Sequence, residues 1–383
     1  MADLLQIIDL AESDQVQLSY TSDSGQTETA PPVEFSPPLT ESESAEIRWY
    51  INDYPENTFG ESSERARRVE TGLKDIGMLL FRVVFGSNAE ARALAEKAFG
   101  TEPPLLAIVS TRPEFLGLPW ELLNNGGDTY LASQLDGLSR RVSYDPLESF
   151  SGKLPTDQLN VLMLLPPSSD GTGSIASEAL TALESLPVSA ELDCLRPSTE
   201  SSLRDHMSNR QSHYHLTHLD GFTIDSQGIH MEDGTGGYQA ISADLLAATL
   251  TSAQTPVVLI NASSSSPLDC VMSFAAELSQ NGVPQVVVTP LPIPGSGKVL
   301  LSEFFFKGLS GGDQVTRAIS TVRQAMVEHP QRPSATGPLD SWDWTLPMVF
   351  ESKTYSPEAI VIEDQQAPTP GIPQAEQEAS GNE

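Results

Sequence analysis

The amino-acid sequence predicts an α/β fold in which a mostly parallel central sheet is flanked by helices. From residue 159 onward, short apolar runs rich in Val, Leu and Ile alternate with longer helical patterns, as in strands that are joined by crossover helices. The run Pro256–Ala262 then ends abruptly in Ser263–Ser266. A buried parallel strand ends in this way where it delivers residues to a site at the carboxyl edge of a sheet.

Length and composition indicate an ordinary globular protein. The chain has 383 residues, of which 39% are hydrophobic, and a mean hydropathy of -0.20, enough for one large domain or two smaller ones. No run approaches the roughly 20 apolar residues of a membrane helix, and Met1–Leu5 lacks the basic start of a secretory signal. Cys194 and Cys270 are too few for a disulfide framework or a structural zinc site. We therefore expect a cytoplasmic protein that binds no membrane, metal or cofactor.

The charge is strongly acidic, with 21 Lys and Arg against 52 Asp and Glu and a formal net charge of -31. This excludes nucleic acid as a natural partner, because phosphate contacts need clustered cations. Two interpretations of the acidity remain open. It can be an adaptation for solubility or salt tolerance, which we favour because the charge is spread along the chain, or it can steer a basic protein partner.

Residues 1–150 predict a smaller N-terminal α+β subdomain. Two strands form a hairpin, Gln26–Pro38 is a loop, and Thr40–Glu43 begins a helix as a capping box. Two more helices and four strands follow in the sequence. The expected strands are Leu4–Leu10, Val16–Tyr20, Leu105–Ser110, Leu116–Leu123, Thr129–Ala132 and Ser139–Tyr144, and the later helices are Ser62–Phe85 and Ala89–Ala98.

Residues 151–355 predict the main α/β domain, entered through a linker at Phe150–Gln158. Ile229–Glu232 and Tyr238–Ile241 read as a small hairpin insertion, and residues 356–383 as an acidic, Pro-rich disordered tail. The expected strands are Leu159–Leu165, Ser189–Leu195, His213–Leu219, Pro256–Ala262, Gln285–Thr289 and Trp344–Glu351. The expected helices are Ile175–Leu186, Thr199–Asn209, Ala243–Ala253, Val271–Gln280, Lys298–Leu309 and Gln314–Glu328.

Several residues could carry chemistry. Gly295–Lys298 is too short for a phosphate-binding loop and lacks the Ser or Thr after the lysine, so we interpret it as a turn before a helix. His218, near the end of its strand, could act as a base for Ser263 at the end of another strand. Cys270 lies near a helix start, where the helix N-terminus would lower the pKa of a thiol. A packed histidine and a buried structural cysteine are the competing interpretations.

Four motifs in the right order resemble the CHAT domain, a caspase-like (clan CD) cysteine peptidase domain that is often fused to tetratricopeptide (TPR) repeats. The resemblance runs from about Leu39 to about Phe350. It implies a caspase-like three-layer sandwich. The motifs are Ile47–Pro55, Leu118–Leu123 with Leu131–Arg141, Gly282–Val288 and Asp343–Phe350.

The resemblance also implies where the catalytic residues should stand. Active members carry His-Phe-x-Gly-His-Gly, whose second histidine is the base, and Asn-Ala-Cys-Gln-Ser, whose cysteine is the nucleophile. On this chain the base position is Phe222, the glycine after it is Thr223, and the nucleophile position is Ser263. A phenyl ring cannot accept a proton, and a serine needs a base more than a thiol does.

These departures predict a degenerate member that is catalytically inactive and acts by binding. The residual candidates for chemistry are His218, Asp220, Ser263 and Cys270. As a scaffold or regulator in bacterial signalling or defence, the protein would bind an active caspase-like peptidase, a TPR-containing protein or a sensor protein, and it could form a homodimer. The alternative is an active hydrolase or peptidase with Ser263, or less favoured Cys270, as nucleophile and His218 as base.

Overall fold

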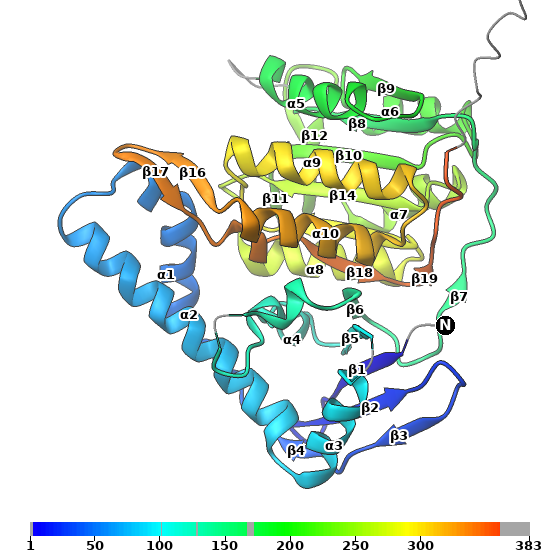
Figure 1. Ribbon diagram of the computed structural model, residues 1–383. Coiled ribbons are helices and arrows are strands. Elements are labelled where there is room, and N and C mark those ends of the chain that lie inside the picture. The colour runs from blue at the N-terminus through cyan, green and yellow to red at the C-terminus, as the bar shows by residue number, and fades with distance from the viewer. Residues whose placement is uncertain (1–2, 101, 128, 167–171, 361–383) are drawn as a thin grey trace, which may run out of the picture.

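One large twisted sheet with helices on both faces forms the body of the molecule in the computed structural model (Figure 1). The structure describes residues 3–360 except 101, 128 and 167–171. Within these residues the main sheet has twelve strands, and β4 pairs with β2 outside the order β3-β2-β1-β5-β6-β18-β15-β14-β10-β8-β9. The predicted α/β class with a mostly parallel central sheet is therefore confirmed.

The strands of the main sheet begin and end as follows: β1 Leu4–Leu10, β2 Gln15–Thr21, β3 Thr27–Thr29, β4 Val33–Glu34, β5 Leu105–Val109, β6 Gly137–Arg141, β8 Leu159–Leu164, β9 Ala190–Leu195, β10 Leu216–Phe222, β14 Val257–Ala262, β15 Gln285–Thr289 and β18 Met348–Glu351. From β9 to β15 each neighbouring pair is parallel, and β18 is antiparallel to β15. All six residues of β14 are buried, because helices cover both faces, and this explains its apolar run Val257–Ile260.

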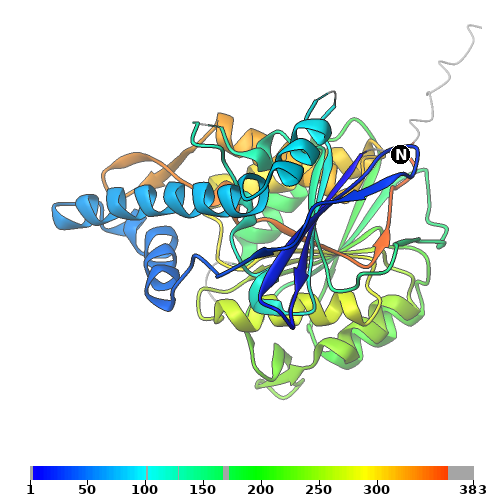
Figure 2. The same cartoon turned by 90° about the horizontal axis from the view of Figure 1, so that it is seen from below.

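Helices cover the sheet in two layers (Figures 1 and 2). α9 packs against α5 and α10 on one face, and α7 contacts α6 and α8 on the other. The helices are α1 Glu41–Asn52, α2 Glu61–Gly86, α3 Ala89–Ala98, α4 Pro113–Leu116, α5 Thr172–Glu184, α6 Glu200–Ser208, α7 Ala243–Ser252, α8 Leu268–Gln280, α9 Gly295–Ser310 and α10 Val315–Glu328, with short 3-10 turns at Tyr54–Glu56, Trp120–Leu122, Leu131–Ser133 and Asp343–Thr345.

The N-terminal part confirms the β1–β2 hairpin and corrects three predictions. The predicted loop Gln26–Pro38 contains β3 and β4. The predicted strands Leu116–Leu123 and Thr129–Ala132 are instead helical turns and loop. Their apolar residues pack into the core without joining the sheet: Trp120 is fully buried, and its ring N–H donates to the Phe115 carbonyl at 2.9 Å.

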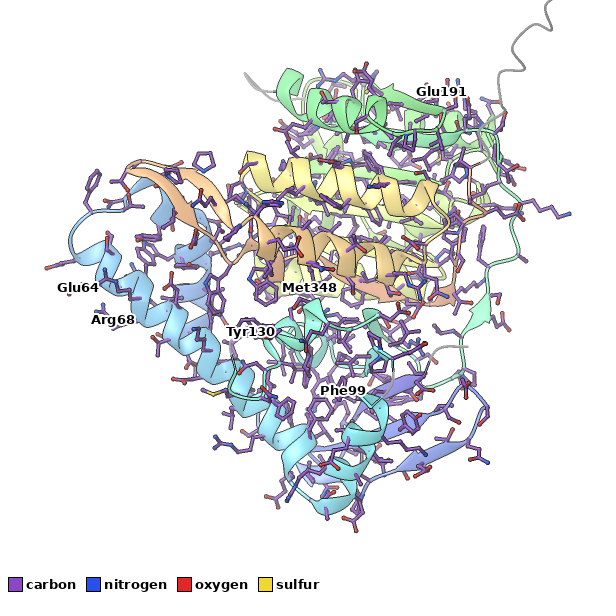
Figure 3. All side chains as sticks on the ribbon, viewed as in Figure 1. Glu64, Arg68, Phe99, Tyr130, Glu191 and Met348 are labelled. Atoms are coloured by element: carbon purple, nitrogen blue, oxygen red, sulfur yellow. The ribbon has the colours of Figure 1, made fainter. Side chains whose placement is uncertain are left out.

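The C-terminal half needs three further corrections. Gly295, which we expected in a turn, is the first residue of α9, after Pro294 as its N-cap. Small hairpins were also missed: β16 Gln331–Ser334 pairs with β17 Gly337–Asp340, and β11 Ile224–Asp225 adds to the expected hairpin of β12 Gly228–Glu232 and β13 Tyr238–Ile241. The last predicted strand is shorter than expected and begins at Met348, which is labelled in Figure 3. Of the predicted tail, residues 361–383 lie outside the described residues.

A buried ion cluster connects the N-terminal residues to α10. Arg140 on β6 donates two 2.8 Å bonds to the carboxylate of Glu121, and Arg323 on α10 approaches the same carboxylate at 3.2 Å. All three side chains are 0% exposed. Burial lowers the pKa of Arg323 to about 10, an effect that Glu121 opposes. The division at residue 150 remains a prediction, and the sheet itself is continuous across it through the pairing of β6 with β18.

Glu121→Gln should lower the free energy of unfolding by about 3–5 kcal/mol, because it leaves two buried guanidinium groups with no carboxylate to neutralise them. Urea denaturation measures the effect. The matched control is Glu46→Gln in the exposed pair with Arg65, which should cost much less, because solvent screens such a pair. Equal costs for the two variants would contradict this account of the cluster.

Candidate functional site

The candidate site lies where the parallel strands β10 and β14 end. Asp220 is opposite Asn261, but the register then shifts so that Phe222 is opposite Ala262. Gly221, between Asp220 and Phe222, has a φ of +82°, a left-handed backbone conformation that favours glycine. Because paired residues of neighbouring strands point to the same face and faces alternate along a strand, the shift turns Phe222 to the face opposite to that of Asp220.

Phe222 is a core residue. Its side chain is fully buried, and its carbonyl accepts a 2.9 Å hydrogen bond from the Ser263 N–H. The position that the family resemblance gives to the catalytic base thus contributes an apolar ring and a backbone contact. Neither can take a proton from a nucleophile.

The Ser263 hydroxyl belongs to a cluster of hydroxyl groups. It lies 3.0 Å from the Thr223 Oγ1, 2.8 Å from the Ser265 Oγ and 3.2 Å from the Ser266 Oγ. Ser266 in turn accepts a 3.0 Å bond from the Ile224 N–H. Among the residues that the structure describes, each hydrogen-bond partner of this hydroxyl is another hydroxyl. Serine and threonine hydroxyls are too weakly basic at neutral pH to activate one another.

His218 is directed elsewhere. Its Nε2 lies 3.0 Å from the Asn261 Nδ2, and the Asn261 Oδ1 accepts a 2.9 Å bond from the Thr289 hydroxyl. In this arrangement the amide nitrogen donates to Nε2, so the ring proton is on Nδ1, which is buried with no hydrogen-bond partner among the described residues. Burial lowers the pKa of His218 and Lys298 lowers it further, whereas Asp220 opposes both. The structure therefore holds a neutral imidazole on Asn261, and no hydrogen bond joins it to Ser263 within the described residues.

Asp220 forms a buried ion pair that the sequence did not reveal. Lys298, in the first turn of α9, donates a 3.0 Å bond to its Oδ1, and the two side chains are 18% and 3% exposed. His218 lies 3.9 Å from the other carboxylate oxygen. A signal was present: Lys298 precedes the buried Leu301 and Phe305 by three and seven residues, which places it on the inner face of the helix.

The pKa of the Cys270 thiol is shifted in the direction opposite to the one expected from the helix N-terminus. It is partly buried near the start of α8. Burial raises the pKa of its thiol, and the charges of Asp269 and Asp225 raise it further. Burial and the two neighbouring carboxylates therefore disfavour a thiolate at this position. The second cysteine, Cys194, is exposed on β9.

A groove lies beside the cluster of hydroxyl groups around Ser263, which we call the serine cluster. It has a volume of about 830 Å³ and is bounded by the end of α1, the Pro292–Pro294 segment, the β16–β17 hairpin and Ser264. Arg48 of α1 donates to the Ser266 carbonyl, and the Ala335 N–H donates to the Pro55 carbonyl at 2.9 Å. The N-terminal helix and the hairpin are thereby fixed around the carboxyl edge of the sheet.

The described residues contain no group of three or more His, Cys, Asp or Glu side chains that could hold a metal ion. Likewise, none of the helices in the described part of the chain has the length and apolar character needed to cross a bilayer.

The family model of the CHAT domain matches residues 78–351. This is well over half of the chain, which therefore belongs to the CHAT-domain family. The predicted family is confirmed, and with it the caspase-like α/β fold.

The chain is also similar in fold to a solved structure, the separase–securin complex of Saccharomyces cerevisiae, with a TM-score of 0.46 and 11% sequence identity. The similarity covers 91% of this chain but only 30% of the solved chain. No curated protein matches the chain in sequence.

The stability of the protein should depend on the neutral state of His218. Since its folded pKa lies below the ordinary value of about 6.5, protonation favours the unfolded chain, and the free energy of unfolding should fall as pH drops below about 6.5. One such histidine contributes a slope of up to about 1.4 kcal/mol per pH unit. His218→Gln should remove this part of the slope in urea titrations between about pH 7.5 and 5.5.

The exposed His329→Gln is the matched control variant. An unchanged slope in His218→Gln, equal to that of the control, would contradict the burial of a neutral imidazole.

Proposed function

We propose that this protein is a catalytically inactive caspase-like protein that acts in the cytoplasm through protein–protein contacts, as a scaffold or regulator. The observation that carries the proposal is the Ser263 hydroxyl, which is hydrogen-bonded to hydroxyl groups (Thr223, Ser265 and Ser266) while Phe222 packs in the core. Its partner would be an active caspase-like peptidase, a TPR-containing protein or a sensor protein.

The chemistry supports inactivity. A positioned general base contributes roughly 10²–10⁴-fold to a rate, and a nucleophile works as a unit with its base, so that loss of either one removes most of the catalysis. The alternative, a hydrolase with Ser263 as nucleophile and His218 as base, requires the imidazole to leave Asn261, its 3.0 Å partner. Thr223 adds a further obstacle, because an incoming base would have to displace its hydroxyl, which lies 3.0 Å from that of Ser263.

The groove beside the serine cluster supports the binding role. It lies at the carboxyl edge, where open α/β sheets bind their ligands, and the buried Ile293 and the partly buried Pro292, Pro294 and Pro55 give it an apolar lining. Asp53 and Glu56 add negative charge at one end. A segment of a partner protein with apolar and basic side chains would complement this lining in polarity and charge.

Purified protein should not cleave peptides. In a library of fluorogenic peptides that varies the residue before the scissile bond, the wild-type protein and Ser263→Ala should release fluorophore at the same background rate, because neither holds an activated nucleophile. Cleavage by the wild type that Ser263→Ala abolishes would overturn the proposal in favour of the serine hydrolase.

Ala335→Arg should weaken binding of the partner at least tenfold, because the new side chain fills the groove from the β16–β17 hairpin. The experiment isolates complexes from the native host with tagged wild type, identifies the retained protein and measures its Kd for purified variants. The control, Ala248→Arg, is on an exposed position of α7 away from the groove and should bind as the wild type does. Retention of no caspase-like, TPR-containing or sensor protein, or equal binding by Ala335→Arg, would count against the proposal.

A further inference from the structure

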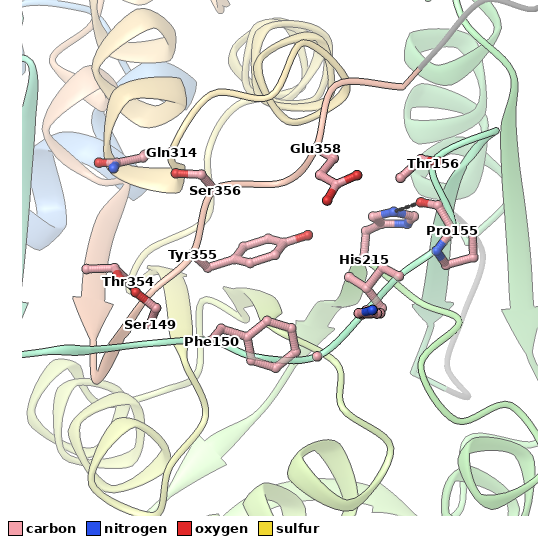
Figure 4. A pocket seen from close by; sticks show the side chains of 13 residues that line it. Ser149, Phe150, Pro155, Thr156, His215, Gln314, Thr354, Tyr355, Ser356 and Glu358 are labelled. Atoms are coloured by element: carbon pink, nitrogen blue, oxygen red, sulfur yellow. Dashed lines mark hydrogen bonds between the residues drawn. The ribbon is translucent and has the colours of Figure 1, made fainter.

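A second cavity lies at the opposite edge of the sheet, near the amino ends of β8 and β10 (Figure 4). β10 has seven residues, which separates its two ends by about 20 Å at about 3.3 Å per residue. The cavity has a volume of about 680 Å³, within the size range of small-molecule sites. Its walls come from residues 149–150 and 152–156, from His215 and Gln314, and from residues 354–356 and 358.

Tyr355 carries a hydroxyl that has no partner among the described residues, although the residue is only 8% exposed. Figure 4 shows this hydroxyl pointing into the space between Phe150, His215 and Glu358. Burial raises the pKa of Tyr355, so the group remains an O–H donor at neutral pH. A buried donor without a partner is costly, and a ligand with a hydrogen-bond acceptor at this point would remove that cost.

The walls around Tyr355 are firmly held. The Phe150 ring meets the Tyr355 ring edge to face at a centroid distance of 5.5 Å and an angle of 89°. His215 uses both ring nitrogens: Nε2 donates to the Pro155 carbonyl at 2.9 Å, and Nδ1 accepts from the Asn160 N–H at 3.0 Å. Burial also lowers the pKa of His215. The imidazole is therefore a neutral wall whose position is fixed before any ligand arrives.

The lining combines flat apolar surfaces with small polar groups. Phe150, Leu154 and Pro155 offer surfaces for a ring, and hydroxyl and amide groups surround them. These polar side chains belong to Ser149, Thr156, Gln314, Thr354 and Ser356. Among the described lining residues, Lys153 and Glu358 contribute opposite charges. This balance, in a chain of net charge -31, gives no cluster of cations for a phosphate.

We propose that this cavity binds a nucleoside, a neutral heterocycle that carries sugar hydroxyls. The base lies against Phe150 and Leu154, the Tyr355 hydroxyl donates to a carbonyl or ring nitrogen of the base, and the hydroxyl and amide side chains bind the sugar. This inference is independent of the proposed function at the carboxyl edge, because neither Ser263 nor the groove beside it contributes to the cavity.

The test is isothermal titration of the full chain with adenosine, guanosine, cytidine and uridine, and with adenosine monophosphate. At least one nucleoside should bind saturably with a Kd below about 1 mM. Tyr355→Phe should weaken that binding about tenfold through loss of one hydrogen bond, whereas Tyr238→Phe, at an exposed position on β13, should bind as the wild type does. For adenosine, the added phosphate should weaken binding.

Thermal unfolding shows whether the variant folds. Without ligand, Tyr355→Phe should melt at or above the wild-type temperature, because it removes a buried unpaired hydroxyl, and a saturating nucleoside should raise the melting temperature of the wild type more than that of the variant. Absence of saturable binding by all four nucleosides, equal affinity in Tyr355→Phe, or tighter binding of adenosine monophosphate than of adenosine would each overturn the proposal.

Discussion

The pairing of β10 with β14 across the shift at Gly221 determines the character of the candidate site. Before the shift, His218 and Asp220 point to the face that α9 covers, where Asn261 and Lys298 bind them. After it, Phe222 points into the opposite core. The strand ends therefore bring all the expected positions to one edge while sending their side chains to different environments. Within the described residues, no hydrogen bond at this edge joins Ser263 to His218 or to another base.

Buried charge stabilises the framework around that edge in two places. Glu121 pairs with both Arg140 and Arg323 between the N-terminal residues and α10, and Lys298 pairs with Asp220 near the end of β10. Each charge was removed from water at considerable cost, so removing one partner is far more damaging than losing an exposed ion pair. Such pairs favour one packing of helix on sheet. The two buried ion pairs therefore stabilise the position of the candidate site independently of any catalytic activity.

The sequence was most informative where burial on both faces produced continuous apolar runs. β14 and β15 were predicted nearly to the residue for that reason, and the order of alternating strands and helices followed. The prediction for Leu116–Leu123 was wrong, because a buried apolar run has the same sequence pattern whether it forms a strand or a series of helical turns. The position of Ser263 could be predicted, since it follows from the end of its strand. The environment of Phe222 could not, because it depends on a register shift. The helical spacing could place Lys298 on the inner face of its helix, but it could not identify Asp220 as the partner, because that contact joins residues 78 positions apart.

The central claim is that the Ser263 hydroxyl is not activated. Its most direct test is labelling with a fluorophosphonate, which reacts with activated serines, followed by peptide mass mapping across about pH 6–9. The account predicts that Ser263 is no more modified than Ser265 in the same peptide at any pH, since both hydroxyls belong to one network at 2.8 Å. Selective labelling of Ser263 that rises with pH and is lost in His218→Gln would contradict it and identify a working serine–histidine pair.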